Sequence, residues 1–181
     1  MEREIQYTLN DADEIVEVND DWDVFATANG APHLAAGQVL GRSLWDFVTD
    51  DTTRLLYRDV LARVRRDRAV RFTFRCDAPD CRRQLEMEVS AAPRGGATFC
   101  VRTVAEETRP PQALLDPAHP RSGQLLRACG WCKKVDLGGR WAEVEQAVDV
   151  LGLFHHAALP QVTHGICDDC FASMTATIEG R

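Results

Sequence analysis

Two pairs of cysteines constrain the fold of this chain more than any other feature of its sequence. The pairs are Cys129-Gly130-Trp131-Cys132 and Cys167-Asp168-Asp169-Cys170. A gap of two residues lets one tight turn direct both sulfurs toward a common point, and two such turns supply the four thiolates that tetrahedral Zn²⁺ prefers. The sequence therefore predicts one zinc site, with Cys129, Cys132, Cys167 and Cys170 as its ligands.

The segment between the two pairs must fold and return the chain to the metal. It contains 34 residues, and Trp141, Val144, Val148 and Leu151 recur along it at the spacing of one helical face. We therefore expect a helix from Trp141 to Leu151 and a small, mainly helical zinc-knuckle module over residues 125–181. A closed set of four thiolates has no open coordination position, so the metal would be structural and folding would be coupled to its binding.

Charged residues beside the pairs support a metal site. Lys133 and Lys134 follow the first pair directly, and cations there would lower the electrostatic cost of a tetrathiolate centre with a formal charge of about −2. Two alternatives stay open: the CxxC pairs could be redox motifs, or His164 could replace one cysteine in a His/Cys₃ site. We favour a role for His164 as a helix cap or as a hydrogen-bond donor to a ligand.

Composition restricts the class of protein. The chain has 181 residues, of which 45% are hydrophobic and 27% are charged, as in a soluble globular protein with one ordinary domain and a small one. The polar N-terminus and the lack of any run of about 18 to 20 apolar residues predict a cytoplasmic protein without a membrane partner. A net charge of −7 has the wrong sign for binding phosphate backbones, so we expect no nucleic-acid partner.

Three further cysteines lie outside the two pairs. Thiols in the cytoplasm are normally kept reduced, so metal ligation explains the paired cysteines better than disulfides do. Cys76, Cys81 and Cys100 are expected to be ordinary free thiols. Cys76 and Cys81 flank the turn sequence Asp77-Ala78-Pro79-Asp80 between two expected strands.

The first hundred residues predict an α+β fold with helices inserted into one antiparallel sheet. Two apolar runs, Ile5 to Leu9 and Glu14 to Val18, surround a turn and indicate a hairpin. Asn19 or Asp20 can cap a helix that follows, and Asp50 can cap a longer helix from Asp51 to Arg66.

Three later runs alternate apolar and polar residues with a period of two, as half-buried strands do. Their polar face carries opposite charges that could pair across neighbouring strands. The runs are residues 70–74, 85–89 and 99–103, and the charged residues are Arg71, Arg75, Glu86, Glu88 and Arg102. Core candidates are Trp22, Phe25, Leu40, Trp45, Phe47, Phe72, Leu85 and Phe99.

Two motifs stand out in residues 5 to 105. The first is Ile15-Val16-Glu17-Val18-Asn19 followed by Trp22 and Phe25, and the second is Leu40-Gly41-Arg42-Ser43-Leu44-Trp45-Asp46-Phe47 with Asp50 and Thr53-Arg54 behind it. On these residues the segment resembles a PAS domain. The resemblance implies a five-stranded antiparallel sheet with helices packed over one face, a role in sensing or interaction, and an interior that can hold a small-molecule ligand. We see no Asn-Cys-Arg motif for flavin, and His33 lies among loop residues, so neither flavin nor haem is expected.

The resemblance, together with the prolines that follow it at Pro110, Pro111, Pro117 and Pro120, divides the chain into three segments. We expect a PAS-like sensor domain over 1–106, a proline-containing linker over 107–124, and the Cys₄ zinc-binding module over 125–181. The last segment looks like a short cysteine module found beside sensor domains in bacterial signalling proteins.

These segments predict a non-enzymatic, cytoplasmic sensory or adaptor protein of bacterial signal transduction. No phosphate-binding GxxxxGK loop and no convincing nucleophile and base are present, so we expect binding rather than catalysis. The zinc module would mediate protein–protein interaction with signalling partners, and the chain would form a homodimer. One alternative is a thiol-based redox switch that releases zinc on oxidation. Another is a hydrolytic zinc enzyme, which would need an open site and a carboxylate such as Asp168 or Asp169.

Overall fold

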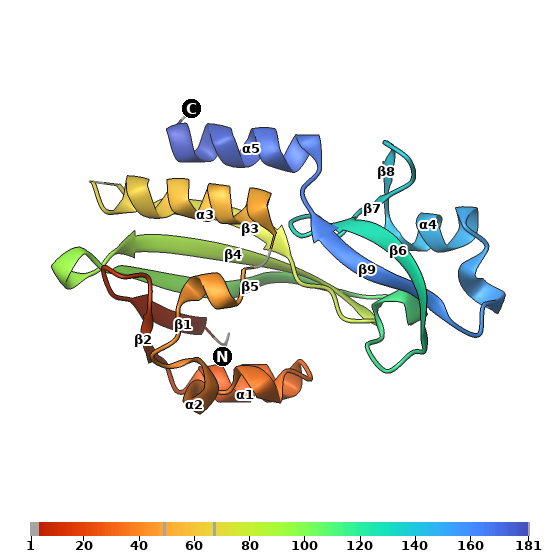
Figure 1. Cartoon of the computed structure of the whole chain (residues 1–181), viewed down its shortest axis with the longest axis horizontal. Helices are drawn as coiled ribbons and strands as arrows, with labels where there is room; N and C mark the ends of the chain where they lie inside the picture. Colours follow the sequence, from red (N-terminus) through yellow and green to blue (C-terminus); the bar gives the residue numbers. More distant parts are fainter. Residues whose placement is uncertain (1–3, 49, 67, 181) are drawn as a thin grey trace. The chain divides into compact units, whose positions relative to one another are not determined.

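The computed structural model of the chain describes residues 4–48, 50–66 and 68–180 (Figure 1). These residues divide into two compact units that interleave along the sequence. The first unit takes the chain up to Thr73, Leu85–Val104 and the residues from Ser173, and the second takes Phe74–Gln84 and Ala105–Ala172. The three consecutive segments expected from the sequence therefore differ from the units of the structure. Across the described residues, every helix is too short or too polar to cross a membrane.

The described part of the first unit contains a five-stranded antiparallel sheet, which confirms the α+β prediction. The strands lie in the order β2-β1-β5-β4-β3, and the tips of β3, β4 and β5 continue into the second unit. The bounds are β1 Glu4–Leu9, β2 Ile15–Val18, β3 Val70–Arg75, β4 Cys81–Ala91 and β5 Ala97–Thr108, with helices α1 Asp21–Ala28, α2 Ala36–Val39 and α3 Asp51–Val64.

Aromatic side chains join two helices to one face of this sheet. Tyr7 of β1 stacks on Phe99 of β5, with ring centroids 4.5 Å apart. Trp22 of α1 meets Tyr7 edge to face at 5.6 Å, and Tyr57 of α3 stacks on Phe99 at 6.2 Å. Since Tyr7 and Phe99 pair across β1 and β5, helices α1 and α3 pack over the same face.

The opposite face of the sheet carries charged residues, as predicted from the sequence. Arg71 forms an ion pair with Glu88 and lies 3.8 Å from Glu86, and Arg102 pairs with Glu86. The cross-strand pairing is therefore confirmed for these residues. Arg75 differs, because it belongs to the second unit together with its partners Asp77 and Glu143.

Of the capping residues predicted at the helix ends, Asp50 is confirmed and Asn19 makes other contacts. Asp50 caps α3 as predicted, since its carboxylate accepts a hydrogen bond from the Thr53 amide at 2.8 Å. Asn19 instead ties the chain to β1: its side chain accepts from the Gln6 amide at 3.1 Å and donates to the Glu4 carbonyl at 2.6 Å. Leu40 is 44% exposed rather than in the core, because the preceding residue, Val39, points inward there.

The second unit contains a second sheet, so the prediction of a mainly helical module is wrong. Its strands lie in the order β8-β7-β6-β9, and β6 and β9 are parallel. The bounds are β6 Arg121–Cys129, β7 Val135–Asp136, β8 Trp141–Ala142, β9 Leu159–Gly165, α4 Val144–Val150 and α5 Asp168–Glu179, whose residues from Ser173 belong to the first unit. The predicted helix begins only at Val144, because Trp141 and Ala142 pair with β7.

The segment expected to be a linker is packed into the second unit. Residues 107–124 include the end of β5, a short turn of 3-10 helix at Ala113–Leu115 and the start of β6. Leu114 is 1% exposed and belongs to the core of this unit, together with Val135, Val144, Ala147, Val148, Leu153 and Leu159. Burial of the Leu114 side chain holds the segment in the second unit, so the segment is not a flexible linker despite its prolines.

Candidate metal centre

Two parallel strands bring the cysteine pairs together. Cys129 is the last residue of β6, and Cys132 lies in the turn that follows. Cys167 follows β9, and Cys170 lies in the first turn of α5. Because β6 and β9 run in the same direction with Cys129 opposite Gly165, both pairs emerge at the same end of the sheet.

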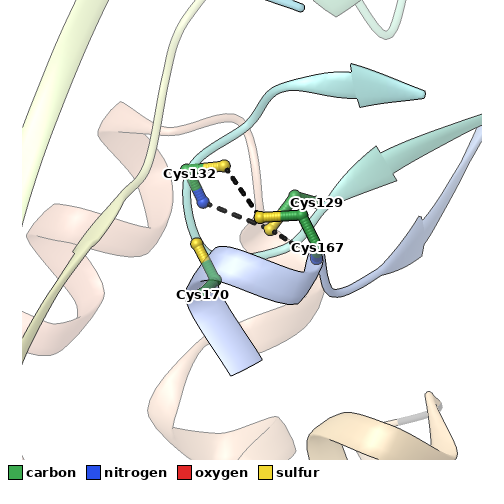
Figure 2. A group of neighbouring side chains, drawn as sticks. All are labelled: Cys129, Cys132, Cys167 and Cys170. Carbon is green, nitrogen blue, oxygen red and sulfur yellow. Dashed lines mark hydrogen bonds between the residues drawn. The ribbon is translucent and has the colours of Figure 1, made fainter. Parts of the chain in front are cut away.

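The four sulfur atoms have the spacing of a metal-binding site. They all lie within 4.8 Å of one another, and the sulfurs of Cys132 and Cys167 are 3.8 Å apart (Figure 2). Tetrahedral zinc with Zn–S bonds of about 2.3 Å requires sulfur–sulfur separations of about 3.8 Å. The four thiols therefore lie within metal-binding distance, in an arrangement compatible with zinc.

Backbone amides point at one of the sulfurs. The Cys129 sulfur accepts hydrogen bonds from the amides of Cys132 and Cys167, each at 3.5 Å (Figure 2). One amide comes from its own CxxC turn and the other from the opposite one, so this sulfur joins the two turns. Donors around a thiolate stabilise its charge and orient it toward a metal.

The same contacts make the cysteines electrostatically unequal. The pKa of Cys129 is lowered to about 4, first because it accepts a hydrogen bond from the Cys132 thiol and further because of the backbone amides, while burial opposes the shift. The pKa of Cys132 is raised, because its thiol donates that bond and is partly desolvated. Burial is the largest cause that raises the pKa of Cys170 to about 12. Cys129 therefore carries the first thiolate of the set.

Solvent reaches only part of the site. Cys129 and Cys167 are 0% and 3% exposed, whereas Cys132 and Cys170 are half-buried. A site closed on one side by the sheet and open at two thiols is enclosed enough for a structural metal. It also leaves Cys132 and Cys170 as the thiols that a dissolved reagent can reach.

The first turn is held in shape by main-chain contacts. The Gly130 amide donates to the Gly165 carbonyl at 2.8 Å, which fastens the turn to the end of β9. Lys133 adopts a positive φ of 61°, and its ammonium donates to the Gly130 carbonyl at 2.9 Å. This contact keeps the ammonium within the first cysteine turn.

His164 and the unpaired cysteines stand apart from this cluster. Within the part of the chain that the structure describes, the metal-ligand group formed by these turns consists of the four cysteines alone. His164 lies on β9 and is exposed. Burial and a hydrogen bond with Glu4 raise the pKa of Cys100 to about 11, so that thiol stays protonated.

One neighbour of the site had no signal in the sequence. The Arg75 amide donates to the Trp131 carbonyl at 2.6 Å, inside the first cysteine turn. The two residues are far apart in the chain. A contact between backbone atoms does not depend on the identity of the side chains, so the sequence gives no indication of it. Only the tertiary structure places the end of β3 against the turn.

Comparisons with known proteins add little to this geometry. No protein-family model matches the sequence, and no curated protein matches it either. Among solved structures, the chain is similar to a domain of an HTR-like protein from Haloarcula marismortui ATCC 43049, with 16% sequence identity and a TM-score of 0.38. The similarity covers 56% of this chain and 98% of that domain.

Proposed function

We propose that this chain is a non-enzymatic sensory or adaptor protein whose second unit holds one structural zinc ion. Cys129, Cys132, Cys167 and Cys170 would be its ligands. The observation that carries the proposal is the convergence of four sulfurs within 4.8 Å, with one separation equal to that of tetrahedral zinc. When bound, zinc would supply no reactive position, because four thiolates fill its coordination sphere, and the protein would gain folding stability from it.

The first unit supports the sensory part of the proposal. Its five-stranded antiparallel sheet, with α1 and α3 over one face, is the architecture that the PAS resemblance implies. Tyr7, Tyr57 and Phe99 pack on one another over that face. This unit would receive the signal, and protein partners in cytoplasmic signalling would respond to it.

Elemental analysis tests the zinc site. We expect about one zinc per chain in protein purified without added metal, and none in Cys170→Ser. Cys100→Ser is the matched control, since it removes a thiol outside the cluster and should keep the metal. Wild-type protein without metal, or equal metal in both variants, would overturn the site. An absorption spectrum of the same sample tests the expectation that neither flavin nor haem is bound.

The exposure of two thiols favours one alternative, the redox switch. Peroxide would take two electrons from the reachable, zinc-bound thiolates of Cys132 and Cys170, which would form one disulfide. The peroxide O–O bond would break, and two protons from the solvent would complete two molecules of water. Zinc would then lose two ligands and leave. A chromogenic zinc chelator with added peroxide distinguishes the two functions: release that a thiol reductant reverses supports the switch, and retention supports a structural ion.

The remaining parts of the proposal concern assembly and activity. We propose a homodimer, which sedimentation equilibrium at several protein concentrations would detect as twice the chain mass. We also propose that the closed thiolate set excludes the hydrolytic role of Asp168 or Asp169. Zinc-dependent turnover of an ester substrate that is lost in Cys170→Ser would contradict this.

A further inference from the structure

The turn between β3 and β4, residues 77–80, is held by segments that lie later in the chain within the second unit. The amide of Arg109 donates to the Asp80 carbonyl and the amide of Gln112 donates to the Pro79 carbonyl, each at 2.9 Å. The Arg109 guanidinium donates to the Ala78 carbonyl at 2.8 Å. Arg109 and Gln112 are themselves buried. The backbone of the turn is therefore fastened by partners outside its own hairpin.

Ion pairs reinforce the same turn from α4. The Asp77 carboxylate, 1% exposed, pairs with Arg75 and lies 3.3 Å from the Arg109 guanidinium. Arg75 also pairs with Glu143 at 2.7 Å, and Arg109 pairs with Glu145 at 3.1 Å. Buried charges of this kind persist only while their partners stay in place, because an unpaired charge away from water is costly.

Arg75 connects this network to the cysteine site. Its guanidinium binds Asp77 and Glu143, while its amide donates to the Trp131 carbonyl at 2.6 Å. Trp131 lies between Cys129 and Cys132, and its side chain is buried. The position of the Trp131 carbonyl depends on the shape of this turn, and a metal held by both cysteines would fix that shape.

We infer that metal occupancy of the four-cysteine site controls the order of the β3–β4 turn. The inference rests on the proposed zinc site and adds a regulatory consequence to it. With zinc bound, the Trp131 carbonyl stays in reach of the Arg75 amide, and Arg75 holds Asp77 and Glu143. Without zinc, the turn loses this anchor.

Hydrogen exchange followed by NMR on the full chain tests the inference. Zinc is removed with a chelator and restored with zinc chloride. We expect removal to speed exchange at the amides of Arg75, Arg109 and Gln112, while the amides of β1 keep their rates. Unchanged rates at the three amides, or a uniform rise that includes β1, would overturn the inference.

The coupling must also act in reverse, because linkage between two sites is reciprocal. Glu143→Gln removes the charge that Arg75 binds just before α4, so we expect zinc affinity, measured by competition with a chelator, to fall by at least about fivefold. Glu107→Gln is the matched control, since Glu107 is 70% exposed and lies 3.7 Å from Arg82. Equal affinities for the two variants would contradict the inference. Wild-type protein that binds no zinc would instead reject the metal site itself.

Discussion

Cys129 does more in this site than supply one ligand. It is fully buried, and its sulfur accepts two backbone amides from the two cysteine turns. Cys170 is half-buried, and burial keeps its pKa high. The four cysteines are thus equivalent as predicted metal ligands, but they differ in burial, hydrogen bonding and pKa once the chain is folded.

Alanine substitutions would separate these two roles. Cys129→Ala and Cys170→Ala should both lose zinc, but Cys129→Ala should also leave two buried amides without their acceptor. We expect Cys129→Ala to lower the free energy of unfolding by about 1–3 kcal/mol more than Cys170→Ala does. Urea unfolding of both variants measures the difference, and equal values would show that the amide bonds contribute nothing.

The stability of the first unit depends on pH in the alkaline range through Tyr57. Burial raises its pKa from the ordinary 10.0 to about 12. Above pH 10 the unfolded chain loses this proton while the folded chain retains it, so the stabilisation is complete below pH 10 and is lost as the pH rises toward 12. We expect urea midpoints to fall across this window, and the fall should be shallower in Tyr57→Phe. An unchanged slope in the variant would contradict the assignment.

At the scale of elements, α3 depends on a cap that the sequence predicted. Asp50→Ala should cost about 1 kcal/mol of stability, because the Thr53 amide would lose its acceptor. Asp20→Ala is the matched control, since Asp20 begins α1 without a side-chain cap bond to any residue that the structure describes. Thermal unfolding compares the two variants, and equal losses would refute a specific role for the Asp50 cap.

Some strands could be predicted from the sequence alone, and others could not. Alternating runs in the first hundred residues predicted β3, β4 and β5, because one face of each is buried and the other is charged. The second sheet was not predicted, because its strands lack a run of alternating apolar residues. Strand β6 begins with Arg121, Ser122, Gly123 and Gln124, and β7 and β8 contain two residues each. Trp141 fitted a helical spacing but pairs in a strand, so tertiary contacts overrode the local pattern.

The candidate site was more predictable than the fold around it. Metal-ligand spacing is local, so the two CxxC pairs identified all four cysteines of the cluster. The contacts of Arg75 with Glu143 and Trp131 join residues that are distant in the chain. Pairs of this kind leave no local pattern in a single sequence.

At the scale of the whole molecule, the interleaving of the two units makes the chain hard to divide. A fragment that ends at residue 106 loses Arg109 and Gln112, which hold the β3–β4 turn, whereas one that ends at residue 124 keeps both. We expect unfolding temperatures to rise from fragment 1–106 to fragment 1–124 and again to the full chain. Scanning calorimetry would measure this order, and a fragment 1–106 as stable as fragment 1–124 would show that these contacts add nothing.

The position of the two cysteine turns at the ends of β6 and β9 has a consequence for synthesis. Cys132 is made 35 residues before Cys167, which at about 5–20 residues per second is roughly 2–7 s. During that interval the nascent chain carries only the first CxxC pair of the site, without the parallel strand that completes the cluster. Tight metal capture therefore waits until the second pair has been made, and a ribosome stalled between the two pairs would present an incomplete thiol site to any oxidant nearby.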